Sequence, residues 1–391
     1  MFEREKRIPS IDRFRGIAIA LMIMFTATEM YTATDFFVPL STHDLTKALL
    51  LIPGYGFFDL IAPFFIFASG LSFGFAFSSA ERKVGLPAAY SVMGRKGVKV
   101  VGLGSLLLFS FDGIGLFFFV CAILCLTLLV LRFTWKKSRE LFSYDILFDK
   151  ILFALGILLL IVAVADNLLL LFGKTPTDSH WTALPSIGVS MLVCVAFSKR
   201  KPYVKVTAVY LLTLLVFLMN LYIPQGNFAY FTHGGFLGSF GYALLFLCAD
   251  TVVTLQKMRK TLAHTFAATI GILAVTSCAI IVPSKAAVNV SYALVSFVFA
   301  YVLYFVVSLF DKVRVKKFPL LTLLGQNSLM IYMWHVPLSP MVGLMENGLI
   351  AYWPVSDGMR VVLGFMGMAV YLFGTYAVVW ALQKRKIRFR I

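Results

Sequence analysis

An acidic residue and a proline stand four positions apart within one apolar stretch of the sequence. Asp59 and Pro63 lie in the run Phe57 to Phe67. Proline has no backbone N–H, and in a helix its ring displaces the carbonyl of the residue four positions earlier, which is Asp59 here. A carboxyl group and a freed carbonyl therefore fall together in an apolar segment, where each needs a partner from the protein or from water. We expect a polar cavity beside Asp59.

Histidine supplies the second kind of chemistry, because imidazole accepts and releases protons near neutral pH. Asn327, Ile331 and His335 recur every four residues, a spacing that places side chains on nearly one face of a helix. We predict that Asp59 orients His335 for acid–base catalysis, with His43 as the second choice of base. The alternative is structural: Asp59 ties helix ends together and His335 caps a neighbouring backbone.

Basic side chains cluster where two apolar runs begin. Arg13 and Arg15 stand at the first run, and Arg95, Lys96 and Lys99 stand at the third. Guanidinium and ammonium groups bind phosphate through charge-assisted hydrogen bonds, so an anionic cofactor could lie between the two clusters. The alternative is that these cations bind no ligand and only mark the cytoplasmic ends of membrane-spanning helices. The predicted cofactor-binding residues are Arg13, Arg15, Arg95, Lys99, Asn327 and Ser328.

The elements that position these side chains are predicted to cross a membrane. The chain has 391 residues, of which 60% are hydrophobic and 14% are charged, whereas soluble proteins have about 25% charged residues. So few charges cannot cover a soluble surface of this size. We predict an all-α, polytopic membrane helix bundle in which residues 1–391 form a single domain. The net charge of +17 does not indicate nucleic-acid binding, because the basic residues lie between apolar runs.

Twelve apolar runs approach the length of about 20 residues that spans a bilayer as a helix. If both termini are cytoplasmic, every Lys and Arg lies on the cytoplasmic side except Lys47, Lys174, Lys285 and Arg360. This asymmetry is the positive-inside pattern of a multi-pass membrane protein. We expect the protein to lie in the plasma membrane. The runs lie near residues 14–33, 54–78, 98–111, 114–131, 151–172, 182–198, 203–223, 232–255, 264–283, 291–310, 319–338 and 360–382.

Three segments together resemble the heparan-alpha-glucosaminide N-acetyltransferase-like family of transmembrane acyltransferases. They are Ser10 to Gly16, Asp59 to Phe67, and Gly325 to Leu329 followed by Tyr332 and His335. The resemblance implies an enzyme that takes acetyl-CoA from the cytoplasm and transfers its acetyl group to a sugar amine or hydroxyl outside. Acetyl-CoA would then be a co-substrate, and membrane lipids and a glycan acceptor would be the partners. Whether the chain forms a homodimer stays open.

One position departs from the family pattern. The family's key catalytic histidine stands ten residues before the aspartate that aligns with Asp59, and this position is Leu49 here. His43, in the same loop, could take its place, as could His335 or His233 from other helices. Two other functions therefore stay open: a catalytically inactive family member, and a secondary transporter with intramembrane acids as ion sites. Those acids are Glu29, Asp59, Asp166 and Asp250. No cysteine or histidine spacing predicts a metal site.

The charge asymmetry makes a direct topological prediction. Exterior loops are expected near residues 34–53, 173–181, 224–231, 284–290 and 339–359. Single cysteines introduced as Lys137→Cys and Asp357→Cys, in a background without native cysteines, should react with an impermeant thiol reagent from opposite sides of the membrane. Labelling of both from the same side would contradict the topology.

Overall fold

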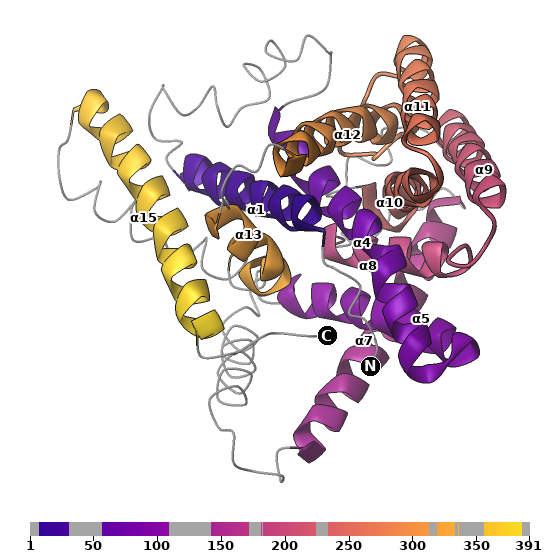
Figure 1. The fold of residues 1–391 in the computed structure, drawn as a ribbon, viewed down its shortest axis with the longest axis horizontal. Helices are drawn as coiled ribbons and strands as arrows, with labels where there is room; N and C mark the ends of the chain where they lie inside the picture. Colours follow the sequence, from indigo (N-terminus) through magenta and orange to yellow (C-terminus); the bar gives the residue numbers. More distant parts are fainter. Residues whose placement is uncertain are drawn as a thin grey trace.

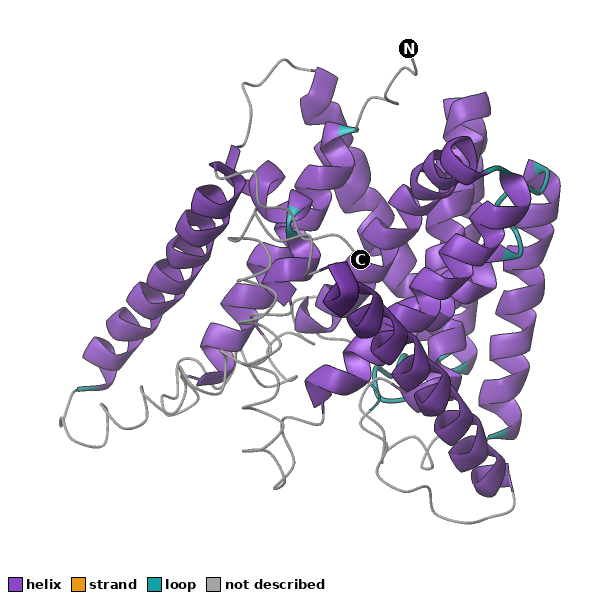
Figure 2. Ribbon diagram, turned by 90° about the horizontal axis from the view of Figure 1, so that it is seen from below, coloured by secondary structure: helices purple, strands orange, loops and turns teal. Residues whose placement is uncertain are grey.

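The fold is all-helical wherever the structure describes it. The computed structural model describes residues 8–30, 57–108, 142–171, 181, 183–223, 234–312, 319–332, 335 and 356–384. Every regular element among them is a helix, which confirms the predicted fold class (Figure 1, Figure 2). The predicted span near 114–131 and most of the predicted exterior loops, with His43 and Leu49, lie outside the described residues.

The helices follow the apolar runs of the sequence. Among the described residues, five helices are long and apolar enough to cross a membrane: α4, α9, α10, α11 and most of α12. The chain is therefore a multi-pass membrane protein, while the count of twelve spans and the orientation of the termini stay predictions. In chain order the elements are α1 (Pro9–Met30), the 3-10 helix η1 (Phe57–Leu60), α4 (Ile61–Val84), α5 (Leu86–Leu108), α7 (Phe142–Leu171), α8 (Ala183–Val195), α9 (Pro202–Tyr222), α10 (Gly235–Met258), α11 (Lys260–Ile280), α12 (Val290–Lys312), α13 (Pro319–Gln326) and α15 (Asp357–Lys384).

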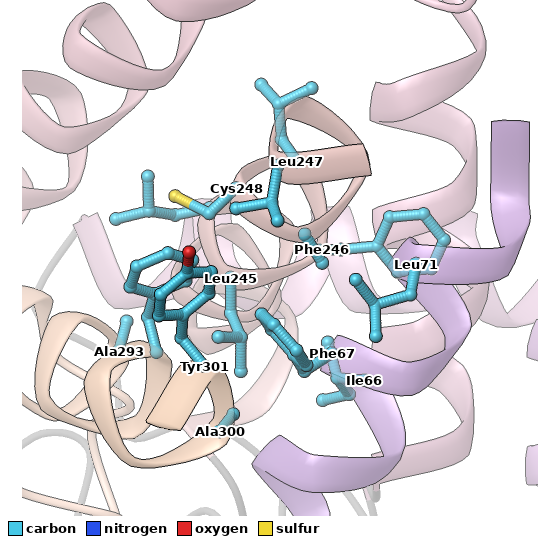
Figure 3. Packing of buried hydrophobic residues seen from close by; sticks show 14 of the residues in the cluster. Ile66, Phe67, Leu71, Leu245, Phe246, Leu247, Cys248, Ala293, Ala300 and Tyr301 are labelled. Carbon is cyan, nitrogen blue, oxygen red and sulfur yellow. The ribbon is translucent and has the colours of Figure 1, made fainter. Parts of the chain in front are cut away.

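Helix α10 forms the centre of the bundle. It contacts α4, α8, α9, α11 and α12 (Figure 1). Its most apolar stretch is 83% buried, whereas that of α9 is only 22% buried. A helix that is apolar on all sides is stable where neighbours cover every side. Figure 3 shows its Leu245 and Phe246 packed with Phe67 and Leu71 of α4 and with Tyr301 of α12.

Small residues let the central helices approach closely. Gly70 and Gly74, one turn apart on α4, both face α10. A Cβ atom at Gly70 would overlap the backbone oxygen of Phe246, and one at Gly74 would lie 3.0 Å from a carboxylate oxygen of Asp250. Helices in a membrane associate through such close packing, because lipid offers no hydrophobic driving force between them.

The apolar run near 319–338 does not form one continuous helix. Helix α13 ends at Gln326, Asn327 adopts a turn, and residues 328–332 are helical again. Asn327 itself explains the interruption. Its backbone N–H bonds the oxygen of Leu324 three residues back, and its side-chain amide donates to the oxygen of Leu323 at 2.9 Å. Such local side-chain bonds compete with the regular helix ladder.

The contact between α4 and α10 should govern the stability of the bundle. Gly70→Ala should lower the unfolding temperature in detergent, because overpacking typically costs about 1–3 kcal/mol. Gly94→Ala is the matched control, since a Cβ at Gly94 meets nothing within 4 Å and alanine favours helix by about 1 kcal/mol. Equal effects of the two substitutions would contradict the proposed close contact.

Candidate functional site

A cavity of about 470 Å³ runs inside the bundle between α1, α4, α5, α8 and the polar segment that follows α13. On α4 its wall extends from Ile61 to Ala76. At 1.5 Å per residue this stretch measures roughly 22 Å along the helix axis. The wall alternates apolar rings, such as Phe65 and Phe73, with the hydroxyls of Ser69 and Ser72. The cavity can therefore hold an elongated ligand with both apolar and polar parts.

The charged side chains that line the cavity are all cationic. They are Arg15, Lys96 and Lys285, and no acidic side chain lines it among the residues that the structure describes. Charges enclosed by apolar walls interact more strongly than charges in water. The cavity therefore favours an anionic ligand.

Arg15 reaches the cavity from the second turn of α1. Its guanidinium donates a hydrogen bond to the hydroxyl oxygen of Ser72 on α4. The neighbouring acid, Asp12, accepts a hydrogen bond from the side-chain amide of Gln326, with 3.2 Å between nitrogen and oxygen. Gly16 and Gly325 allow α1 and α13 to meet closely enough for this bond. Arg15 is thereby held in the middle of α4's length rather than at the mouth of the bundle.

The polar segment after α13 forms another wall of the same cavity. Gln326, Asn327 and Ser328 all line it. Two of the predicted cofactor-binding residues, Asn327 and Ser328, thus share a cavity with a third, Arg15. The broken helix brings these side chains together, because consecutive residues of a straight helix would point in different directions.

The three basic residues of α5, Arg95, Lys96 and Lys99, lie in three different environments. Helix α5 begins at Leu86, earlier than the apolar run indicated, so the cluster lies inside the helix. Lys96 lines the cavity together with Met93 and Val100, which share its helix face. Arg95 is exposed, and Lys99 forms an ion pair with Asp149 of α7.

Three of the predicted cofactor-binding residues therefore lie away from the cavity wall. Arg13, which is buried, is not among its lining residues, and neither are Arg95 and Lys99. Sequence reasoning named Lys96 as part of the cluster but did not select it. The apolar neighbours Met93 and Val100 on the same helix face were the signal that could have identified it.

Asp59 is buried, with 2% of its side chain exposed, and both of its polar groups have partners. The backbone oxygen of Asp59, to which Pro63 has no N–H to donate, accepts a hydrogen bond of 2.6 Å from the hydroxyl of Tyr292 on α12. The ammonium of Lys285, in the loop before α12, lies 3.3 Å from the Asp59 carboxylate. The protein thus supplies the partners that the sequence required for this freed carbonyl and buried carboxylate.

His335 lies in a different environment from Asp59. It is 7% exposed, and its Nδ1 atom lies 3.0 Å from the hydroxyl of Tyr371 on α15. Neither Asp59 nor His335 lines the cavity described above, and their recorded contacts involve different helices. A catalytic pair of Asp59 and His335 therefore stays a prediction, and the alternative base His43 lies outside the described residues.

A buried ion pair joins α9 to α10, and sequence reasoning did not foresee it. The ammonium of Lys205 lies 2.5 Å from the carboxylate of Asp250 and donates to the hydroxyl of Thr254 at 3.0 Å. The absence of a side chain at Gly74 leaves room for the carboxylate. Asp250, one of the acids considered as an ion site, is thus neutralised by a lysine on the neighbouring helix. Among the described residues, no cluster of His, Cys, Asp or Glu could hold a metal ion.

Fold and site together define a polytopic membrane protein with a cation-lined cavity inside its helix bundle. The model of the family described as an acyltransferase domain, Acyl_transf_3, matches residues 8–384, and the chain belongs to this family. No curated protein matches the sequence significantly. The match establishes a transmembrane acyltransferase family over nearly the whole chain. The narrower resemblance to heparan-alpha-glucosaminide N-acetyltransferase-like proteins stays a prediction.

The bond between Tyr292 and Asp59 generates a stability prediction. Tyr292→Phe should destabilise the protein by about 1–3 kcal/mol, because a buried carbonyl loses its donor. The cost should shrink in a Pro63→Ala background, since the alanine introduced there restores a backbone N–H that can reach the same carbonyl. Thermal unfolding of the single and double variants measures this coupling. Tyr210→Phe, which removes an exposed hydrogen bond to Thr269, is the control. If the stability costs of the substitutions at 63 and 292 are additive, Tyr292 is not the donor that replaces the missing N–H of Pro63.

Proposed function

We propose that this protein transfers an acetyl group from cytoplasmic acetyl-CoA to a sugar or glycan acceptor on the exterior side of the plasma membrane. Membership of the acyltransferase family supports acyl transfer. The observation that carries the choice of donor is the long internal cavity, whose wall includes the cationic side chains of Arg15 and Lys96. A CoA thioester combines an anionic nucleotide with a slender arm of mixed polarity, and it suits such a cavity.

The donor would enter from the predicted cytoplasmic side. Arg15 and Lys96 would bind phosphate oxygens through charge-assisted hydrogen bonds. The pantetheine arm would extend along α4 past Ser69 and Phe65, and Asn327 and Ser328 would offer amide and hydroxyl partners to its amide groups. Arg13, Arg95 and Lys99 would then act outside this cavity, where they could attract the anionic donor to the entrance.

The reaction itself needs a base near the exterior end. The acceptor oxygen or nitrogen attacks the thioester carbonyl and loses its proton to the base, while the CoA thiolate leaves and takes up a proton. His335, oriented by Asp59, is our proposed base, with His43 as the second choice. Because Leu49 stands at the family's catalytic position, a member that binds acetyl-CoA without turning it over is the second candidate function.

Titration of the purified protein with acetyl-CoA tests the donor site. Arg15→Ala and Lys96→Ala should each weaken binding by about one to two orders of magnitude, because a hydrogen bond to a charged group contributes about 1.5–3 kcal/mol. Lys199→Ala is the matched control, since it removes a lysine that pairs with Glu81 at the protein surface.

Each outcome of this titration separates the candidate functions. Unchanged affinity in both cavity variants would refute the donor site. Tight binding without acetyl transfer to any glycan would favour the inactive member. A wild-type protein that does not bind acetyl-CoA would overturn the proposed function and return the transporter to consideration.

A further inference from the structure

Lys285 occupies the end of the cavity opposite to Arg15. It lies in the loop between α11 and α12, which the charge asymmetry predicts to be exterior, and it reaches Asp59 just before α4. Arg15 contacts Ser72, thirteen residues further along α4. This separation is roughly 20 Å along the helix axis. One small anionic group cannot reach both cations, so the cavity has two separate points at which it can bind negative charge.

The ammonium of Lys285 is accessible from both the cavity and the protein surface. Its side chain lines the cavity and is 30% exposed. An ammonium carries three N–H donors. Its recorded partner among the described residues is the Asp59 carboxylate, which is 2% exposed and therefore lies behind the lysine. The other donors can bind a ligand that enters from outside.

The loop that carries Lys285 is held in a fixed conformation. The buried side-chain oxygen of Asn289 accepts hydrogen bonds from the backbone N–H groups of Ser284 and Tyr292, at 3.3 and 2.9 Å. The Asn289 amide donates to the oxygen of Val282 at 2.7 Å, and Asn220 on α9 accepts a bond from the N–H of Val290. A loop ordered in advance loses little conformational entropy when it binds a ligand.

We propose that Lys285 makes the exterior end of the cavity a binding site for an anionic acceptor, a sugar that carries a carboxylate or a phosphate. This inference rests on the proposed acetyl transfer and specifies the class of its acceptor. Lys285 meets the acidic group of the acceptor, which places the acceptor's hydroxyl or amine inside the cavity, where the thioester end of the donor would lie. Asp59 keeps the lysine oriented from behind.

Titration of the purified full-length protein with D-glucuronic acid, glucose 6-phosphate and glucose tests this site. At equal ionic strength, at least one acidic sugar should bind about tenfold or more tightly than glucose, as expected for a charge-assisted contact. The tighter of the two acids identifies the acidic group as carboxylate or phosphate. Lys285→Gln should reduce acidic-sugar binding to the level of glucose, whereas Lys285→Arg should keep the preference.

Three controls make the result specific. Lys199→Gln removes a lysine of similar exposure, 38%, whose partner is Glu81, and it should leave sugar binding unchanged. Lys285→Gln leaves the Asp59 charge buried without its ion pair, so the double variant Lys285→Gln with Asp59→Asn provides a neutral replacement of the pair. Acetyl-CoA titration of each variant should give wild-type affinity, which separates failure of the acceptor site from failure of the donor site.

Two results would overturn the proposal. One is equal binding of glucose and both acidic sugars by the wild-type protein. The other is an acidic preference that survives in both the single Lys285→Gln variant and the neutral double variant. Either result would leave the proposed donor site intact, because acetyl-CoA binding is measured separately.

Discussion

A polar group placed inside this apolar bundle needs a partner from the protein, because hydrocarbon provides none. Much of the architecture follows from that requirement. The backbone carbonyl of Asp59, which Pro63 cannot bond, accepts a hydrogen bond from Tyr292, and the carboxylate of Asp59 pairs with Lys285. Elsewhere in the bundle Lys205 neutralises Asp250 between α9 and α10. Breaking such a buried pair is costly, because the remaining charge has no solvent to stabilise it. These contacts fix which helices are neighbours.

Helix α4 packs closely against another helix on one face and borders the cavity on another face. One face carries Gly70 and Gly74 and presses against the central helix α10. The other face carries Phe65, Ser69 and Ser72 and borders the cavity. The tight contact holds α4 in place, and the looser face leaves volume for a ligand. Figure 1 shows the resulting arrangement, with α9 and α11 on one side of α10 and with α1, α13 and α15 on the opposite side of the bundle.

The distribution of charge along the cavity fits a reaction that joins two substrates from opposite sides of a membrane. Arg15 and Lys96 serve one part of the cavity and Lys285 serves the other. The broken helix at Asn327 contributes further polar groups to the cavity wall. Irregular backbone at membrane depth is tolerated where it lines a cavity, so the interruption is consistent with a functional role for this segment. The loop between α11 and α12, which the hydrogen bonds of Asn289 hold in a fixed conformation, keeps Lys285 in position.

The sequence by itself determined the membrane class, the all-helical fold and the bounds of α9 to α12 to within a few residues, because these depend on local hydropathy and spacing. It also identified the Asp59 carbonyl as a group that needs a partner. Tertiary structure alone decided that the partners are Tyr292 and Lys285, more than two hundred residues away. It likewise decided that Lys96, rather than Arg95 or Lys99, faces the cavity. The physical reason is that the surroundings of a cation depend on how its helix is rotated and on which helix it faces. Neighbouring residues in the sequence determine neither the rotation nor the facing helix.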